Sequence, residues 1–420
     1  MACKKIVPKI RFDGFDGDWA NQKLGEVATL QNGYAFKSEN FIDYPSTRIV
    51  LTPGNVHIGG GYQDGKGRYF DESVDVPDQY ILSPDDIFIM MTDLTPTAQT
   101  LGYPAKVPEN GSTFLLNQRL AKIVSRGIDS DFLFHTLTTD NYHNAIVAGA
   151  SGTTVRHTSP SKILSCELFF PHYDEQAAIG NFFRNFDDTM ALKKQQHEQT
   201  INIKKAMLEK MFPKKGADMP EIRLDGFTEA WEVCLFSDLA SIRRGLTYSP
   251  SNVRETGIRV LRSSNIAEDV FALHMDDIFV EPSAVTIEPI QPKDILITSA
   301  NGSARLIGKR AIIPDSVGLA VHGGFMLAAT AKDPDFVNAL MGSIWYRKFL
   351  ELNVTGGKGA ISNLRKTDLE SQLVLTPKAA AEKAAIGNFF RNIDVLLAAQ
   401  QEALEKLQNI KNACLSKMFV

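Results

Sequence analysis

The stretch AIGNFFRN at residues 178–185 occurs a second time, without a change, at residues 385–392. An identical run of eight residues is very improbable by chance, so it indicates an internal duplication with an offset of 207 residues. At the same offset, IKKAMLEKMF (203–212) aligns with IKNACLSKMF (410–419). The 420-residue chain is therefore expected to consist of two related halves.

A second pair of matching segments lies upstream in each half. PKIRFDGFDGDWANQKLGEVATLQNG, starting at Pro8, aligns with PEIRLDGFTEAWEVCLFSDLASIRRG, starting at Pro220, at an offset of 212 residues. The two offsets, 212 and 207, differ by five, so the middle of the second copy is five residues shorter. Between these anchors the copies diverge. The pattern predicts one structural frame that carries two different surfaces.

The periodicity of apolar residues predicts the class of fold. Residues 20–170 and 232–376 contain short β-branched or aromatic runs separated by Gly, Pro and Asn, with a few helical pieces, which is typical of mixed α+β domains. Residues 174–212 and 379–419 contain no proline and have helical apolar spacing, so each is expected to form one long helix. The predicted fold is two tandem α+β domains with two long helices.

Apolar positions in the two long segments recur at alternating spacings of three and four, as in a coiled coil. A long helix on its own would expose this stripe to water, so we expect the two helices to pair with each other. The predicted interface positions are Ile179, Phe183, Phe186 and Met190 in the first helix, and Ile386, Phe390, Ile393, Leu397, Leu404 and Leu407 in the second.

The sequence lacks the motifs of a catalytic or metal-binding protein. Its four cysteines are far apart, without a C-x-x-C pair, and no H-E-x-x-H motif, methyltransferase (N/D/S)-P-P-(Y/F) loop or nuclease motif is present. We therefore interpret the chain as non-catalytic and without a metal. The N-terminal segment has no apolar signal region, and no run approaches the ~20 apolar residues of a membrane span, so we expect a cytoplasmic location without membrane association.

A net charge of −4 and a pI near 6.1 mean that any nucleic-acid binding must come from local patches. Residues 241–262 contain five arginines and one acid, Glu255, and residues 301–310 contain three cations and no acid. Arginine suits guanine edges and phosphates because its planar group forms paired hydrogen bonds, although a solvated surface is the alternative interpretation. Polar loops at 151–162 and 355–366 precede the long helices. The candidate DNA contacts are Arg68, Arg119, Arg156, His157, Lys162, Arg243, Arg244, Arg259, Arg262, Arg305, Lys309, Arg310 and Lys358.

Two motifs carry a resemblance to a known family. P-x-x-R-F-x-G-F-x-x-x-W-x-x-x-x-L-G-E-V (residues 8–27), with its echo from Pro220, and P-x-x-x-E-Q-x-x-I-x-x-F (171–182) resemble the specificity subunits of type I restriction-modification systems. The resemblance covers the whole chain. It implies two target recognition domains that each read half of a bipartite DNA site, and two helices that form an antiparallel, pseudo-twofold coiled coil. The expected segments are residues 1–172 and 216–377 for the recognition domains, and 173–215 and 378–420 for the helices.

The resemblance also implies partners. They are double-stranded DNA, two modification (methyltransferase) subunits and, in complete systems, restriction (endonuclease and translocase) subunits. S-adenosylmethionine, ATP and magnesium would belong to those subunits, and this chain would bind no cofactor. The second copy departs from the motif, because it has Lys383 in place of Gln176 and one extra residue before the helix. A coiled-coil scaffold that does not bind DNA and a self-sufficient methyltransferase with an unrecognised motif are the alternatives.

Overall fold

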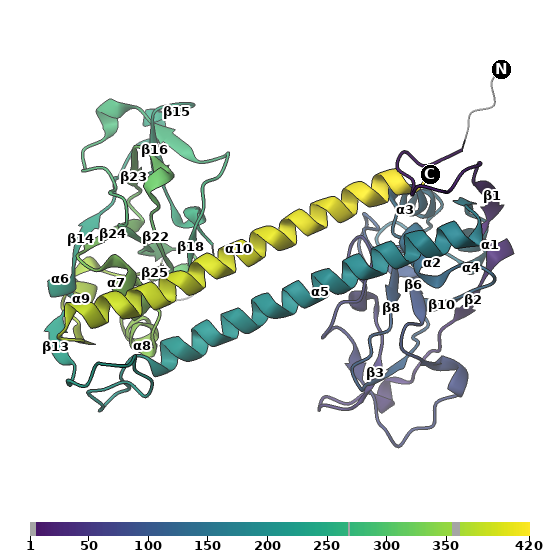
Figure 1. The fold of residues 1–420 in the computed structure, drawn as a ribbon, viewed down its shortest axis with the longest axis horizontal. Helices are drawn as coiled ribbons and strands as arrows, with labels where there is room; N and C mark the ends of the chain where they lie inside the picture. The colour runs from purple at the N-terminus through teal and green to yellow at the C-terminus, as the bar shows by residue number, and fades with distance from the viewer. Residues whose placement is uncertain (1–5, 268, 355–361) are drawn as a thin grey trace. The chain divides into compact units, whose positions relative to one another are not determined.

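The computed structural model describes residues 6–267, 269–354 and 362–420, and it contains two compact units (Figure 1). The first unit comprises the chain up to Lys194 together with Ala403–Val420, and the second comprises Gln195–Glu402. Both are mixed α+β, as predicted. The four segments expected from sequence need one adjustment, because each long helix contributes its two ends to different units and those ends form part of the unit cores.

The first unit is built on two four-stranded sheets. One is antiparallel, in the order β2-β10-β6-β8, and the other has the order β4-β3-β9-β5 with β3 and β9 parallel. Two short pairs, β1-β12 and β7-β11, and the helices α1 to α4 complete it. The bounds are β1 Ala20–Lys23, α1 Leu24–Val27, β2 Ala28–Asn32, β3 Arg48–Val50, β4 Arg68–Tyr69, β5 Ile81–Leu82, β6 Ile87–Met90, β7 Thr92–Asp93, β8 Pro104–Lys106, β9 Thr113–Leu115, β10 Leu120–Ser125, α2 Ser130–Thr136, α3 Asp140–Ala148, β11 Arg156–His157, α4 Pro160–Leu164 and β12 Glu167–Phe170.

The second unit repeats this plan. Its antiparallel sheet has the order β14-β24-β20-β22, and its other sheet has the order β15-β19-β16-β23 with β16 and β23 parallel. Pairs β13-β26, β21-β25 and β17-β18 lie beside them. The bounds are β13 Glu232–Leu235, α6 Phe236–Leu239, β14 Ala240–Arg244, β15 Val253–Arg254, β16 Ile258–Leu261, β17 Ile266–Ala267, β18 Val270–Phe271, β19 Ile278–Val280, β20 Ile295–Thr298, β21 Ala300–Asn301, β22 Arg310–Ile312, β23 Ala320–His322, β24 Met326–Ala331, α7 Pro334–Leu340, α8 Ile344–Asn353, β25 Ser362–Asn363, α9 Lys366–Glu370 and β26 Leu373–Thr376.

The two long helices are α5 (Tyr173–Lys210) and α10 (Ala380–Met418), each within two residues of the predicted bounds. They begin 207 residues apart, which is the offset of the duplicated AIGNFFRN. The extra residue of the second copy lies just before α10. Two residues separate β12 from α5, and three separate β26 from α10.

Within each unit the two helices pair in antiparallel directions. The Lys411 Nζ lies 2.5 Å from the Asp187 carboxylate in the first unit, and the Lys204 Nζ lies 2.5 Å from Asp394 in the second. These ion pairs are equivalent, because Asp187 and Lys204 recur as Asp394 and Lys411 at the offset of 207. All the predicted interface positions are buried or half-buried, namely Ile179, Phe183, Phe186, Met190, Ile386, Phe390, Ile393, Leu397, Leu404 and Leu407. The predicted helix pairing is confirmed.

An aromatic cluster anchors the helix ends in each core. In the first unit the Trp19 ring centroid lies 5.8 Å from Phe132 and 6.4 Å from Phe419, at the end of the chain. Phe183 of α5 lies 5.7 Å from the same Phe419. The equivalent cluster of the second unit is Trp231, Phe336, Phe390 and Phe212. Since burial of such rings stabilises a core by roughly 1.5–3 kcal/mol each, the helix ends belong to the units they enter.

The repeated AIGNFFRN stretch has a structural explanation. A Cβ atom on Gly180 would lie 2.9 Å from the backbone nitrogen of Phe132, and one on Gly387 would lie 2.8 Å from that of Phe336. Each long helix therefore approaches the start of a short helix, α2 or α7, too closely for any side chain. Phe183 and Phe390 follow three residues later and are buried.

The P-x-x-R motif supplies a buried ion pair in each unit. Arg11 Nε and Nη2 each donate to the Glu175 carboxylate at 2.7 Å, and Arg223 makes the same paired contact with Glu382 at 2.8 Å. Both carboxylates are no more than 2% exposed. The Trp231 Nε1 also donates to Glu382, at 3.2 Å. These contacts fix the segment before each domain to the start of a long helix.

Candidate nucleic-acid interface

Three of the predicted DNA-contacting arginines have acidic partners within the second unit. Arg259 pairs with Asp277, which is 7% exposed, and Arg243 pairs with Asp294, which is 1% exposed. Both acids lie outside residues 241–262, so a count of charge along the sequence missed them. Together with the pair of Arg254 and Glu281, these ion pairs neutralise three of the four excess positive charges of that stretch.

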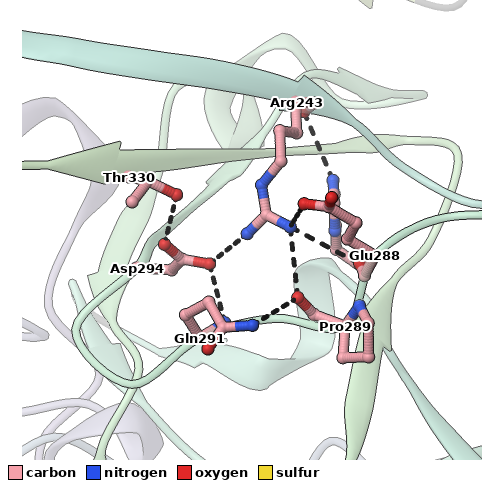
Figure 2. A network of polar contacts seen from close by, with 7 residues as sticks. Arg243, Glu288, Pro289, Gln291, Asp294 and Thr330 are labelled. Atoms are coloured by element: carbon pink, nitrogen blue, oxygen red, sulfur yellow. Dashed lines mark hydrogen bonds and ion pairs between the residues drawn. The ribbon is translucent and has the colours of Figure 1, made fainter.

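The contacts of Arg243 are structural (Figure 2). Its guanidinium donates to the Asp294 carboxylate and to the Pro289 carbonyl, the latter at 3.1 Å. Asp294 also accepts from Thr330 Oγ1 at 2.6 Å and from the Gln291 backbone nitrogen at 2.8 Å. This network ties β14 to β24 and the loop before β20, and Arg243 stays a prediction as a DNA contact.

Arg310 is the clearest correction. It is 6% exposed, and its guanidinium lies over the Tyr346 ring, donates to the Asn338 carbonyl at 3.1 Å and lies 3.3 Å from Asp269. Because it sits on β22 inside the unit, its charge stabilises packing and does not face a ligand. Arg259 is half-buried and uses its charge in the ion pair with Asp277, and as a DNA contact it stays a prediction.

The other candidate residues of the second unit remain available to contact DNA. Arg244 and Arg305 are exposed, and Arg262 and Lys309 are half-buried. None of these four has an ion pair with any residue that the structure describes. Lys358 lies outside the described residues. These positions stay predictions as DNA contacts.

The candidates of the first unit lie mostly at its surface. Arg68, Arg119, His157 and Lys162 are exposed, and Arg156 is half-buried. The Lys162 Nζ donates to the Gly149 carbonyl at 2.6 Å, and the Arg156 Nη1 donates to Gly152 at 3.2 Å, so these two side chains order the predicted polar loop. Arg68 lies over the Phe41 ring, 3.9 Å from its centroid. These five residues stay predictions as DNA contacts.

His322, at the end of β23 in the second unit, is a buried titratable group. It is fully buried, its Nε2 lies 3.3 Å from the Arg243 carbonyl, and burial lowers its pKa to about 4. A histidine that is neutral when folded and binds a proton when unfolded costs stability between its folded pKa and its ordinary pKa of about 6.5.

We expect acid to destabilise the second unit through His322. Lowering the pH from 7 to 5 should reduce its free energy of unfolding by about 2 kcal/mol, since only the unfolded chain is protonated in that window. The His322→Gln variant, whose amide can still bond to the Arg243 carbonyl, should show a smaller loss in urea denaturation at the two pH values. His172→Gln, at an exposed position, is the control and should leave the loss unchanged.

Metal-ligand clusters and membrane-spanning helices are absent from the part of the chain that the structure describes. Within residues 6–267, 269–354 and 362–420, no cluster of three or more His, Cys, Asp or Glu side chains could hold a metal ion. No helix in this part of the chain is long and apolar enough to cross a membrane.

Comparison with known proteins shows which family the chain resembles. Residues 16–202 match the model of the type I restriction modification DNA specificity domain. Over nearly its whole length the chain is similar to type I restriction-modification specificity subunits. It is 24% identical to the EcoKI specificity subunit of Escherichia coli (strain K12) over 96% of this chain and 88% of that protein. It is 22% identical to the EcoBI specificity subunit of Escherichia coli over 96% and 85%.

Solved structures of such specificity subunits share the fold of this chain. A type I restriction-modification S subunit from M. genitalium superimposes with a TM-score of 0.63 over 99% of both chains, at 15% identity. A second structure, from work on complex assembly of a type I R-M system, has a TM-score of 0.52 over 95% of this chain and 97% of its own. The resemblance is confirmed, and the family is the non-catalytic targeting component of these systems.

Proposed function

We propose that this chain reads a bipartite DNA site, with each unit contacting one half, and thereby directs its partner subunits to that site. The observation that supports this most is the duplication. Buried ion pairs and aromatic clusters recur in both units, whereas the exposed residues between them differ. A repeated frame with two unlike surfaces suits recognition of two unlike half-sites.

The partners that fit this role are two modification subunits, because the duplication gives the chain two similar faces. Restriction subunits would join in complete systems. S-adenosylmethionine, ATP and magnesium would be bound by these partners, and the complex would act on DNA in the cytoplasm.

The test is methylation with and without the modification subunit. We expect the purified chain to transfer no methyl groups, and we expect co-expression with its modification subunit to methylate adenines only in one bipartite sequence. Methylome sequencing of a host without this chain is the control. Methyl transfer by the isolated chain, or methylation without sequence preference, would contradict the proposal.

A further inference from the structure

The second unit contains a cleft of about 520 Å³ between its two four-stranded sheets and their loops. Its wall includes Tyr248 after β14, Arg262 and Ser263 after β16, Asn301 at the end of β21, and Phe325 before β24. No carboxylate is among the lining residues that the structure describes. The cleft is therefore aromatic, polar and open to a negatively charged polymer.

The side chains in the cleft have unused bonding capacity. Phe325 is 62% exposed, although a large ring is usually covered. The Arg262 Nε is buried without an acceptor, and its Nη2 reaches only the Asp276 carbonyl, at 3.4 Å. A buried donor without a partner destabilises the fold, so Arg262 gains by turning toward an external acceptor. Asn301 has one amide N–H beyond its 3.3 Å contact with Ser263.

The loop that presents Arg262 is built like its counterpart in the first unit. Asn265 and Asn55 are both fully buried. The Asn265 Oδ1 accepts from the Arg262 backbone nitrogen at 2.8 Å, and the Asn55 Oδ1 accepts from the Thr52 backbone nitrogen at 2.9 Å. The frame is thus retained, whereas the residue it presents changes from Thr52 to Arg262.

The opposite wall shows the same contrast. Gly245 and Gly33 occupy equivalent positions, and a Cβ on either would overlap a carbonyl of the turn before β24 or β10. This close approach fixes the turn against the loop after the first strand of each sheet. On that fixed turn Phe325 stands where the first unit has Arg119, each one residue before its strand. In both walls of the cleft the backbone arrangement is therefore the same as in the first unit, whereas the side chain that the wall presents is different.

We propose that this cleft receives one base of the half-site that the second unit reads. The Phe325 ring contacts the face of the base, and Arg262 and Asn301 bind its edge, where purines present acceptors to these residue types. The inference rests on the proposed function and adds to it the residues that set specificity. Phe325 and Tyr248 were absent from the sequence-based candidates, because aromatic residues carry no charge signal.

The test is methylome sequencing of cells that co-express the modification subunit with Arg262→Ala, Asn301→Ala or Phe325→Ala. We expect discrimination at one position of one half-site to fall roughly tenfold or more, with the other half-site and the gap unchanged. Arg254→Ala is the matched control, since this exposed arginine of the same unit pairs with Glu281 outside the cleft.

The outcomes separate the two proposals. If the wild-type chain directs site-specific methylation and all three variants keep the original sequence, the cleft does not read a base, although the proposed function stands. Equal weakening at every sequence by a folded variant would assign phosphate contact and overturn base reading. If Arg262→Ala does not fold, Phe325→Ala still tests the proposal, because truncating an exposed ring leaves the fold intact. Failure of the wild-type chain to direct methylation would instead contradict the proposed function.

Discussion

Replacing Arg223 by Ala is expected to lower the free energy of unfolding of the second unit by about 3–5 kcal/mol. The change removes the only cation that contacts Glu382 in the described structure, and this carboxylate is 2% exposed. A buried charge without a partner costs far more than the ion pair itself contributes. Urea denaturation at neutral pH would measure the loss.

Two variants control for other causes. Arg223→Ala combined with Glu382→Gln should recover part of the loss, because the neutral amide needs no counter-charge and still accepts from the Trp231 Nε1. Arg365→Ala, which removes an exposed arginine paired with the half-buried Asp368, should cost less than about 1 kcal/mol. If Arg223→Ala costs no more than Arg365→Ala, the buried pair does not hold the segment before β13.

The duplication and the long helices could be predicted from sequence because both depend on signals that are local and repeated. The heptad spacing places every predicted interface residue on the covered face of its helix. The division of the chain could not be predicted in the same way. Whether Phe419 belongs with α10 or with the core around Trp19 depends on contacts across most of the chain, which no periodicity records.

The candidate DNA contacts were harder to predict because ion pairing is not local. Arg243 pairs with an acid 51 residues away and Arg310 with one 41 residues away. A count of charged residues along a short stretch of sequence therefore treats such arginines as free to bind DNA, although each has an acidic partner in the fold. Phe325 was missed for a different reason, because it carries no charge. Its exposure follows from a turn that the close approach at Gly245 holds in place, and a local sequence pattern does not record this contact.

Removing one heptad from each long helix is expected to shorten the unread gap of the DNA site by about three base pairs. Seven residues correspond to ~10 Å of helix at ~1.5 Å per residue, and base pairs repeat every ~3.4 Å. Residues 193–199 of α5 and the equivalent 400–406 of α10 are suitable, because they lie between the two interhelical ion pairs. The half-sites should be unchanged.

The register of the helix pair survives this deletion. Asp187 and Lys204 are 17 residues apart in α5, and Asp394 and Lys411 are 17 residues apart in α10. The deletion shortens both separations to ten residues, so both interhelical ion pairs can still form. Deleting the heptad from α5 alone breaks this match and should abolish directed methylation, which makes it the control. Three base pairs also rotate one half-site by roughly a third of a turn, so methylome sequencing is a better measurement than affinity. Methylation at the original spacing by a folded double deletion would show that helix length does not set the gap, and altered half-sites would mean that the helices themselves read sequence.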